Sequence, residues 1–486
     1  MSLETTIASR LLSPNESLES YHQVSTLWAG YGHIYRLKIS QEEDDGREGS
    51  SSVRPREKKR RYTKILKVIS PPPGTDLGTF PQDEEDEGQR GLDEGHLRKM
   101  YSYRVESNFY KNFSKYLEKE QEGGHHVGSG GVHVPKLFSS LSQPRRLEDG
   151  SKRARKSKEP DSQWLLLEDL SVDYPEFGER RGTLGEGQVL AALDWLAKFH
   201  ATFWRHESVF VGGTSGGGGR NDGDTCKTSL EHCPSPLLAF RQGWDGEGLW
   251  DQGGYSYLST RMSELGSIDK GSKWGRLGLH ADSDLPYAVD FLLNDSRVGM
   301  TLVHGDVKSA NMAFSSEGGG HGDGGSVQMA MYDFQYVGKG LGVQDVVKFL
   351  NTSVPMRMLC GGEGGDGSWS RPSGSSTRCN EGCWDEAKLL QRYKTRLLAE
   401  LEERIKVSDR VKAAELREEV EKYRGGDVFE RQYELALVSW VRFLAGWGWW
   451  GNVDWIQGKV ERLLSDEKWV GQVLAEWRRR GGRRES

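Results

Sequence analysis

The chain has 486 residues, of which 35% are hydrophobic and 28% are charged, and its formal net charge is −6. With a mean hydropathy of −0.69, part of this length should be polar loop and not core. The slightly acidic balance gives no reason to expect nucleic acid as the main partner. The most apolar stretch, residues 435–450, is too short to span a membrane and carries Arg442, so we expect a buried helix and turn there.

Compartment signals are few. The N-terminal segment MSLETTIASRLLSPNES lacks the apolar core of a secretory signal. Five cysteines without framework spacing favour a reducing, cytoplasmic location. Cys360, Cys379 and Cys383 could be metal ligands, but without a matching second pair free thiols are the simpler interpretation. Basic runs at 54–61 and 152–158 are either nuclear localisation signals or solvated loops, and the second is the commoner case.

Seven low-complexity segments rich in Gly, Ser or charge interrupt the patterned sequence. They are residues 41–56, 71–95, 121–131, 143–161, 211–224, 315–326 and 361–382. None resembles a repeated unit, and each lies between patterned segments. We therefore interpret them as loop insertions in one fold.

The first patterned segments are strands. Residues 34–39 alternate, with Tyr35, Leu37 and Ile39 on one face. Residues 64–69 alternate as well, and this places Lys67 between Ile65 and Ile69 on one face of the strand. The short apolar run 164–167 predicts a third strand.

Residues 99–119 follow, and their pattern is helical. Tyr103, Glu106, Tyr110, Phe113 and Leu117 recur at steps of three and four and so share one helical face. Glu106 is the only charge on that stripe. A buried carboxylate needs a cationic or hydrogen-bonding partner, and no basic residue lies three or four positions away on the helix.

The second half is mainly helical, with patterns at 186–206, 385–405 and 428–455. His200 lies on the apolar face of the first of these helices, where a hydrogen-bonded core histidine is a better interpretation than a metal ligand. The order predicts an α+β fold with two segregated lobes. We place a small β-rich lobe with one helix at 20–168, a larger, mainly helical lobe at 169–470, and tails at 1–19 and 471–486.

The most informative stretch is TLVHGDVKSANMAF at 301–314, followed by MAMYDFQYVG at 329–338. Asn311 lies five residues after Asp306, and Asp333 begins a downstream Asp-Phe-Gln. Protein kinases have an Asp, an Asn five residues later and then Asp-Phe-Gly. Phosphoryl transfer requires one carboxylate to take the acceptor's proton, while an amide oxygen and a second carboxylate hold Mg²⁺.

These motifs resemble the aminoglycoside phosphotransferase and choline kinase-like superfamily, especially its ecdysteroid kinase-like branch. The likeness rests on Gly305 where protein kinases favour Arg, on Asp-Phe-Gln, on LLLEDL at 165–170, on LAKFHATFW at 196–204 and on VSWVRFLAGWGWWGN at 438–452. It runs discontinuously from about residue 28 to about residue 464. The resemblance implies a two-lobed, protein-kinase-like fold.

The resemblance also implies roles for residues of the catalytic loop. Asp306 would be the catalytic base, Asn311 and Asp333 would be Mg²⁺ ligands, and His304 would support the loop. Asp345, in GVQDVVKFL, would begin a helix and brace this loop.

Other residues would bind ATP. Lys67 would hold the α- and β-phosphates, and Glu106 would pair with it. A hinge whose backbone meets adenine would be formed by Glu168, Asp169 and Leu170.

Two features depart from the family pattern. Lys308 is usual in protein kinases and less so in the small-molecule branch, and it could either contact the γ-phosphate or face solvent. Gly30 and Gly32 provide two glycines where protein kinases have three. They would cover the phosphates or form an ordinary hairpin turn.

The resulting hypothesis is an ATP- and Mg²⁺-dependent phosphotransferase that acts on a hydroxyl of a small molecule. A protein kinase is one alternative, although no Ala-Pro-Glu segment follows Asp333. A catalytically inactive binding module is another, although the metal-ligand set is intact. The acceptor would meet the region 244–264 and the Trp-rich C-terminus, whose aromatic rings could contact a ring or quaternary ammonium or could simply be core.

Overall fold

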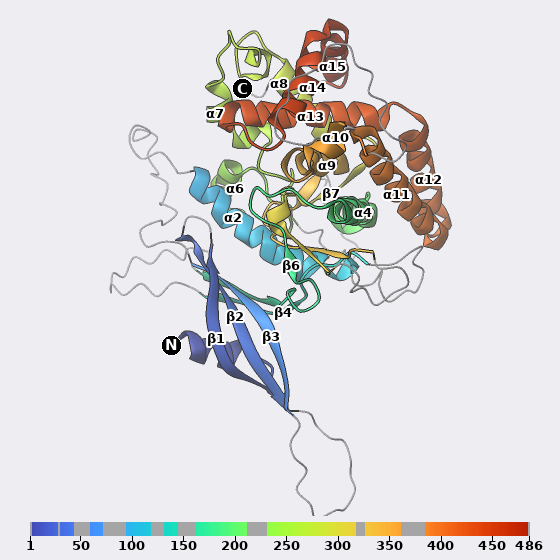
Figure 1. Cartoon of the computed structure of the whole chain (residues 1–486). Coiled ribbons are helices and arrows are strands. Elements are labelled where there is room, and N and C mark those ends of the chain that lie inside the picture. Colours follow the sequence, from blue (N-terminus) through green and yellow to red (C-terminus); the bar gives the residue numbers. More distant parts are fainter. Residues whose placement is uncertain are drawn as a thin grey trace, which may run out of the picture.

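The computed structural model describes residues 2–27, 30–42, 59–70, 94–117, 131–143, 162–210, 231–316, 326–360 and 384–484. The seven low-complexity segments lie outside these ranges except for a few terminal residues. The basic run 152–158, Cys379 and Cys383 also lie outside them. The described residues form a β-sheet at one end and a larger helical part at the other (Figure 1).

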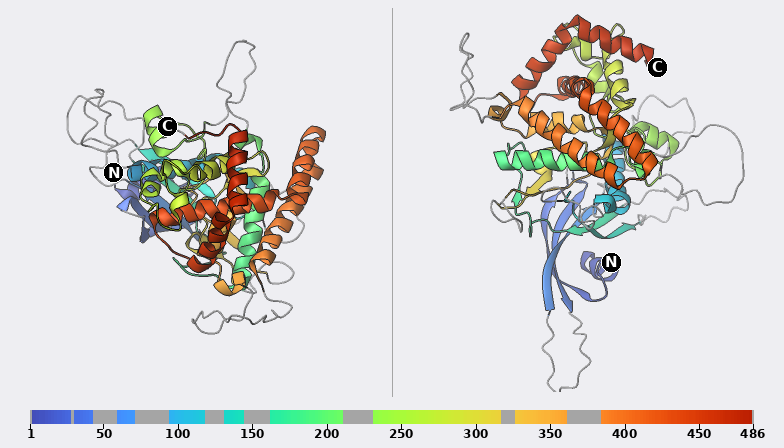
Figure 2. Two further views of the ribbon diagram at one scale, coloured as in Figure 1. Left: turned by 90° about the horizontal axis from the view of Figure 1, so that it is seen from above. Right: turned by 90° about the vertical axis from the view of Figure 1, so that its right-hand side faces the viewer.

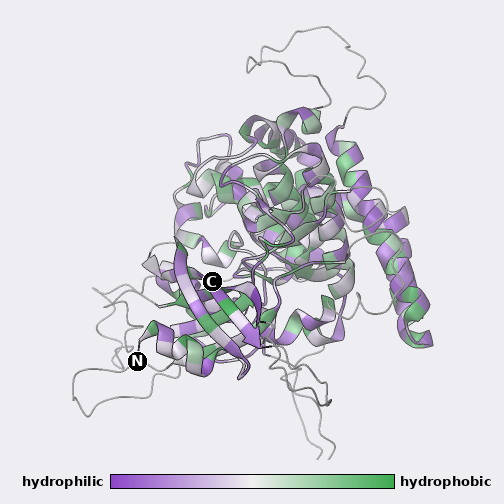
Figure 3. Cartoon of the chain, turned by 60° about the horizontal axis from the view of Figure 1, so that its bottom comes forward, coloured by the Kyte–Doolittle hydropathy of each residue, from purple (hydrophilic) through white to green (hydrophobic). Residues whose placement is uncertain are grey.

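The sheet has five strands in the order β1-β2-β3-β5-β4, and all neighbours are antiparallel. The strands are β1 (Glu16–Thr26), β2 (Gly32–Glu42), β3 (Lys59–Ile69), β4 (Leu137–Gln143) and β5 (Ser162–Glu168). The three strands expected from sequence are therefore confirmed as parts of β2, β3 and β5. Hydrophilic and hydrophobic residues are mixed along the strands of this sheet, as Figure 3 shows. Successive side chains of a strand point to opposite faces.

Two segments that we expected to be tails are parts of the fold. Helix α1 (Leu3–Arg10) buries Ile7 against the sheet residues Leu37, Ile39 and Leu66. At the other end α15 (Glu467–Arg479) buries four apolar side chains against the helical part. Short amphipathic helices at chain ends have few residues to show their period, which explains the difference.

Helix α2 (Glu94–Asn108) lies between the sheet and the helical part (Figure 1) and continues as a π-helical turn, Phe109–Phe113. It begins five residues before the expected start. The stripe predicted from sequence is buried, including Glu106, which is 1% exposed.

The remaining helices form the larger part of the molecule. They are α4 (Glu186–Phe203), α5 (Glu207–Phe210), α6 (Pro236–Gln242), α7 (Met262–Gly266), α8 (Leu285–Asn294), α9 (Gly342–Thr352), α10 (Met356–Cys360), α11 (Glu386–Val407), α12 (Arg410–Gly425), α13 (Val428–Trp447) and α14 (Val453–Ser465), followed by α15. Helices α11 and α12 form a hairpin on one side, and the two chain ends lie far apart (Figure 2). The region 428–455 is interrupted between α13 and α14, where Gly448 and Gly451 both have positive φ.

Short strands flank the two loops that contain the His-Gly-Asp and Asp-Phe-Gln motifs. Strand β7 (Met300–Val303) pairs with β10 (Gly338–Leu341), and β8 (Met312–Phe314) pairs with both β9 (Met329–Met331) and β6 (Glu176–Phe177). The insertion after residue 315 thus joins two strands of a hairpin, as expected. A β-rich part with one long helix and a larger helical part confirm the α+β class. Among the described helices, none combines the length and apolarity that a membrane span requires.

The packing of α1 makes a prediction for stability. We expect Ile7→Ala to lower the free energy of unfolding by about 2–5 kcal/mol, because it leaves a cavity against the sheet. Urea denaturation followed by circular dichroism measures this. Ile7→Val is the matched control and should lower it by only about 0.5–1.5 kcal/mol. If the Ile7→Ala variant and the parent protein have the same midpoint urea concentration of unfolding, α1 does not contribute to the core of the sheet.

Candidate active site

A buried ion pair joins the sheet to α2. The ammonium of Lys67, on β3, donates to both carboxylate oxygens of Glu106 at 2.9 and 2.6 Å. Lys67 is 5% exposed and Glu106 1% exposed. Burial by itself would lower the pKa of Lys67, but the Glu106 and Asp333 carboxylates outweigh it and hold that pKa above its ordinary value. The helical stripe therefore has its cationic partner, from a strand and not from its own helix.

Asp333 completes this cluster from the helical part. Its Oδ1 lies 3.2 Å from the Lys67 ammonium and accepts a hydrogen bond of 2.7 Å from the Gln335 side chain. Burial would raise the pKa of Asp333, but the ammonium groups of Lys67 and Lys308 lower it below its ordinary range. The backbone of Asp333 has φ of +67°, which is rare for a residue with a side chain and is typical of functional sites.

Phe334 anchors this loop between the two parts of the molecule. Its ring stacks on Phe109 of the π-helical turn with centroids 3.9 Å apart, and it meets Tyr110 and His304 edge-on at 5.8 and 4.7 Å. A π-helical turn within a helix often marks a functional site. Here it presents Phe109 to the loop that carries Asp333.

Asp306 lies in the loop after β7 and is 4% exposed. Its Oδ2 accepts from the Lys308 ammonium at 2.7 Å, and Asn311 donates to its main-chain oxygen at 2.9 Å. Its Oδ1 is buried without a hydrogen bond of good geometry among the described residues, and the Tyr255 side chain lies within interaction range of this carboxylate. A ligand's hydroxyl that binds Asp306 would therefore lie next to Tyr255.

His304 and Asp345 brace this loop. Asp345, in the first turn of α9, accepts from the main-chain N–H groups of His304 and Gly305 at 2.6 and 3.0 Å. His304 in turn meets the Tyr332 carbonyl at 3.1 Å and the Asp306 N–H at 3.3 Å, so it links the loops of Asp306 and Asp333. The bracing position expected for Asp345 is therefore present.

His200 belongs to the same scaffold. Its two ring nitrogens lie 2.8 Å from the Tyr393 hydroxyl and 3.2 Å from Asp345. It is fully buried and hydrogen-bonded on both sides. The interpretation as a core histidine is confirmed.

Gly305 has φ of +80°, and its backbone is crowded. A Cβ there would lie 2.2 Å from the Tyr336 carbonyl oxygen and 2.6 Å from the Gly254 nitrogen. Only glycine fits this position, which explains why the larger residue of protein kinases is absent.

Lys348 is a site residue that the sequence analysis missed. It lies three residues after Asp345 on α9, is 5% exposed, and donates a short hydrogen bond to the Gly305 carbonyl. Burial lowers its pKa to about 8. The signal that revealed Glu106, a charge within the apolar pattern of a helix, was also present at Lys348.

The remaining expected site residues lie at strand ends of the sheet, two at the β1–β2 turn and three at the end of β5. Gly30 and Gly32 form the β1–β2 turn, and a Cβ on Gly32 would lie 1.9 Å from the Val68 carbonyl oxygen, so this glycine is required by the hairpin itself. Asp169 is committed to an ion pair with Arg36 at 2.7 Å. Glu168 hydrogen-bonds the Lys136 N–H at 3.1 Å, and Leu170 is buried. Contacts of these five residues with a nucleotide stay predictions.

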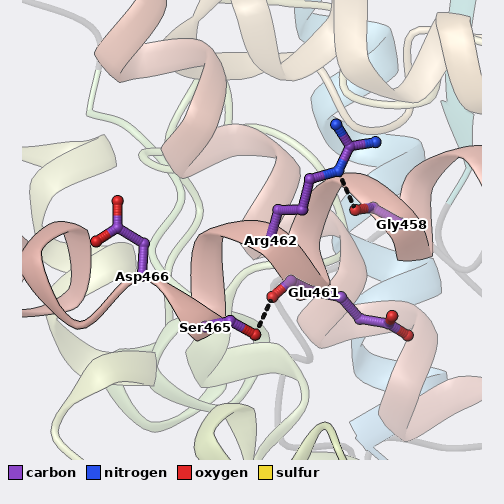
Figure 4. A pocket seen from close by; sticks show the side chains of 5 residues that line it. All are labelled: Gly458, Glu461, Arg462, Ser465 and Asp466. Atoms are coloured by element: carbon purple, nitrogen blue, oxygen red, sulfur yellow. Dashed lines mark hydrogen bonds between the residues drawn. The ribbon is translucent and has the colours of Figure 1, made fainter.

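A surface pocket between α14 and α15 is separate from these residues. It is lined by Gly458, Glu461, Arg462, Ser465 and Asp466 (Figure 4). Two of its side chains are hydrogen-bonded within α14, Ser465 to the Glu461 carbonyl and Arg462 to the Gly458 carbonyl. It contributes nothing to the arrangement around Asp306.

The tertiary structure thus brings together residues separated by more than 200 positions. Lys67, Glu106 and Asp333 form one ionic cluster, and Asp306, Lys308 and Asn311 form a second. His304 and the charge of Lys308, which lowers the pKa of Asp333, connect them. The arrangement can hold an anion at Lys67, a cation at Asp333 and a hydroxyl at Asp306.

Comparison with known proteins gives a limited result. No protein-family model and no curated protein match the chain. Solved structures similar to it include a microcompartment-associated aminopropanol kinase, with 13% identity over 95% of this chain and 96% of that chain and a TM-score of 0.35. An amicoumacin kinase in complex with AMP-PNP and Ca²⁺ has 11% identity over 96% and 92% and a TM-score of 0.36. A Plasmodium vivax ethanolamine kinase has 8% identity over 94% and 85% and a TM-score of 0.33. With identities of 13% or less and TM-scores of 0.36 or less, these similarities do not show what this chain does.

The crowding at Gly305 makes a prediction. We expect Gly305→Ala to lower the free energy of unfolding by more than about 1 kcal/mol, because the loop must move to admit the Cβ. Thermal unfolding measures this. Gly471→Ala, in α15 with nothing within 4 Å of the added Cβ, is the control and should stabilise by about 0.5–1 kcal/mol. If the two substitutions change the free energy of unfolding equally, the backbone at Gly305 is not crowded.

Proposed function

We propose that the chain is an ATP- and Mg²⁺-dependent phosphotransferase that acts on a hydroxyl of a small molecule. The observation that carries the proposal is the buried Lys67–Glu106 pair, whose ammonium also contacts Asp333, together with the buried carboxylate of Asp306. Phosphoryl transfer needs positioning and charge neutralisation more than covalent chemistry, and this arrangement supplies both.

Lys67 would bind the nucleotide's phosphates. Its ammonium now meets Asp333 at 3.2 Å as well as Glu106, and three N–H donors allow it to keep Glu106 while it binds a phosphate oxygen. Its raised pKa keeps it charged at neutral pH. Glu106 would hold it in place.

The donor set fits Mg²⁺. Asn311 turns its amide nitrogen to Asp306, which leaves its amide oxygen for a cation, and Asp333 is held ionised by its neighbours. No group of three or more His, Cys, Asp or Glu that could hold a metal occurs among the described residues. One carboxylate and one amide suit a hard cation that also takes oxygens from a phosphate group. When bound, Mg²⁺ would neutralise charge on the phosphates.

Asp306 would orient the acceptor and take its proton. The acceptor O–H would donate to Oδ1 of Asp306, which has no hydrogen bond of good geometry among the described residues, and its oxygen would attack the γ-phosphorus. The new P–O bond forms as the bond between the γ-phosphorus and the bridging oxygen of ADP breaks, and the proton passes to Asp306. Lys308, 2.7 Å from Oδ2, would hold the carboxylate in this orientation and add positive charge near the transferred group.

A protein kinase is the less suitable alternative. Strand β10 begins at Gly338, five residues after Asp333, and α9 follows it directly at Gly342. This leaves no long segment after the Asp-Phe-Gln motif on which a peptide could lie. An inactive binding module is disfavoured because each residue with an expected catalytic or metal-binding role is present. Membership of the ecdysteroid kinase-like branch rests on the sequence motifs and stays a prediction.

Nucleotide binding can be tested without knowledge of the acceptor. At about 100 times the dissociation constant, MgATP should stabilise the native state by about 2.7 kcal/mol, because only the folded chain binds it. Differential scanning fluorimetry with and without Mg²⁺ measures the shift. Asp333→Asn should reduce the Mg²⁺-dependent part, whereas Asp282→Asn, at a position with a 63% exposed side chain, should not. No shift in the parent protein would favour an inactive module.

Asp306→Asn tests the chemical step. A general base contributes about 10²–10⁴-fold, so turnover with an accepted alcohol should fall by that factor while MgATP binding persists. ADP release during a screen of hydroxylated metabolites, sterols, choline analogues and aminoglycosides identifies the alcohol and measures the loss. Undiminished turnover by the Asn variant would exclude Asp306 as the base, and robust labelling of generic proteins would favour the protein kinase alternative.

A further inference from the structure

An aromatic cluster lies beside the loop of Asp306. It consists of Tyr255, Trp440, Phe443 and Trp447, with Tyr255 and Phe443 centroids 5.4 Å apart and Phe443 and Trp447 stacked at 6.1 Å. Gly254, the neighbour of Tyr255, packs against Gly305 so closely that a Cβ on Gly305 would reach its nitrogen at 2.6 Å. The charge of Asp306 is one cause of the raised pKa of Tyr255, after burial. Tyr255 belongs to the region 244–264, and the other three rings belong to the Trp-rich C-terminal segment. We expected the acceptor to contact these two regions.

The chain's own Arg261 occupies this cluster. Its guanidinium lies 5.9 Å from the Tyr255 ring centroid, 5.2 Å from that of Phe443 and 4.6 Å from that of Trp447. Its Nε donates to the Tyr255 carbonyl at 2.8 Å, and a terminal nitrogen pairs with Glu264 at 2.9 Å. A cation among three rings with an adjacent carboxylate is the environment that proteins use to bind quaternary ammonium ligands.

A second protein cation, Lys348, also contacts the cluster. The Lys348 ammonium lies 4.2 Å from the Tyr255 centroid and 5.0 Å from that of Trp440 while it donates to the Gly305 carbonyl. Lys308 adds a third cation at Asp306 itself. An acceptor that approaches Asp306 from this side therefore meets positive charge and rings that are already engaged by cations.

We propose that Arg261 occupies the place that a substrate's ammonium group would take, and that the acceptor is an alcohol without positive charge near its hydroxyl. The acceptor class rests on the proposed function, whereas the occupied cation site does not. Arg261 is a specificity-determining residue in this account. A cationic alcohol would have to displace Arg261 from the rings and from Glu264, or lie beside like charge.

The occupied site can be tested by binding alone. Arg261→Ala should bind tetramethylammonium at millimolar concentration, with quenching of tryptophan fluorescence from Trp447, which is 53% exposed, while the parent protein should show none at equal ionic strength. Arg98→Ala is the matched control, because Arg98 pairs with Glu94 and donates to the Thr260 carbonyl. It should gain no binding. If Arg261→Ala does not fold, Arg261→Ser, which keeps a hydrogen-bond donor near the Tyr255 carbonyl, replaces it with the same probe.

The acceptor class is tested with two alcohols of the same shape. Choline and 3,3-dimethyl-1-butanol differ only in the charged nitrogen, and the parent enzyme should bind or phosphorylate the neutral compound roughly tenfold better or more. Arg261→Ala should reverse this preference. Binding of tetramethylammonium by the parent, no gain by the variant, or a parental preference for choline would overturn the proposal. Absence of MgATP binding and of all turnover would instead overturn the proposed function and leave the tetramethylammonium result to decide the cation site.

Discussion

The site depends on the buried carboxylate of Glu106, whose two oxygens both accept hydrogen bonds from the Lys67 ammonium. Glu106 lies on the inner face of α2, away from water, and removal of its partner would leave an uncompensated buried charge. Lys67 is that partner, and it reaches Glu106 only if β3 and α2 pack in one arrangement. Because Asp333 also contacts Lys67, the same interaction fixes the position of the helical part relative to the sheet.

Helix α9 has the corresponding role on the catalytic side. Its Asp345 and Lys348, one turn apart, contact the N–H groups and the carbonyl of the residues directly before Asp306. The two side chains thus hold three successive peptide units of the loop, from Val303–His304 to Gly305–Asp306, so the loop has little freedom to rotate. Gly305, whose φ is positive, lies within this held segment.

The insertions occupy positions that leave this framework intact. Strands β2 and β3 pair without interruption up to Glu42 and Lys59, and β8 and β9 pair on either side of another insertion. A longer hairpin loop adds little closure entropy, about 0.6 kcal/mol for each doubling of length. The catalytic and metal-binding candidates therefore keep their neighbours although long polar segments separate them in the chain.

Many of the strands and helices, and the candidate residues of the site, can be predicted from the sequence. Alternation predicted parts of β2 and β3, and a short apolar run predicted β5. A helical stripe identified Glu106 as a charge without a partner on its own helix, and residue spacing identified Asp306, Asn311 and Asp333 as candidates. These signals are local, so a single sequence suffices to find them. The pairing of Lys67 with Glu106 was expected from the family resemblance, and the structure confirms this contact. The contacts of Lys348 with Gly305 and of Arg261 with the aromatic rings became visible only in three dimensions. The partner of a side chain across a core depends on how elements distant in the sequence pack together. The pattern of apolar residues within one helix or strand shows which face is buried, but not which other element covers that face.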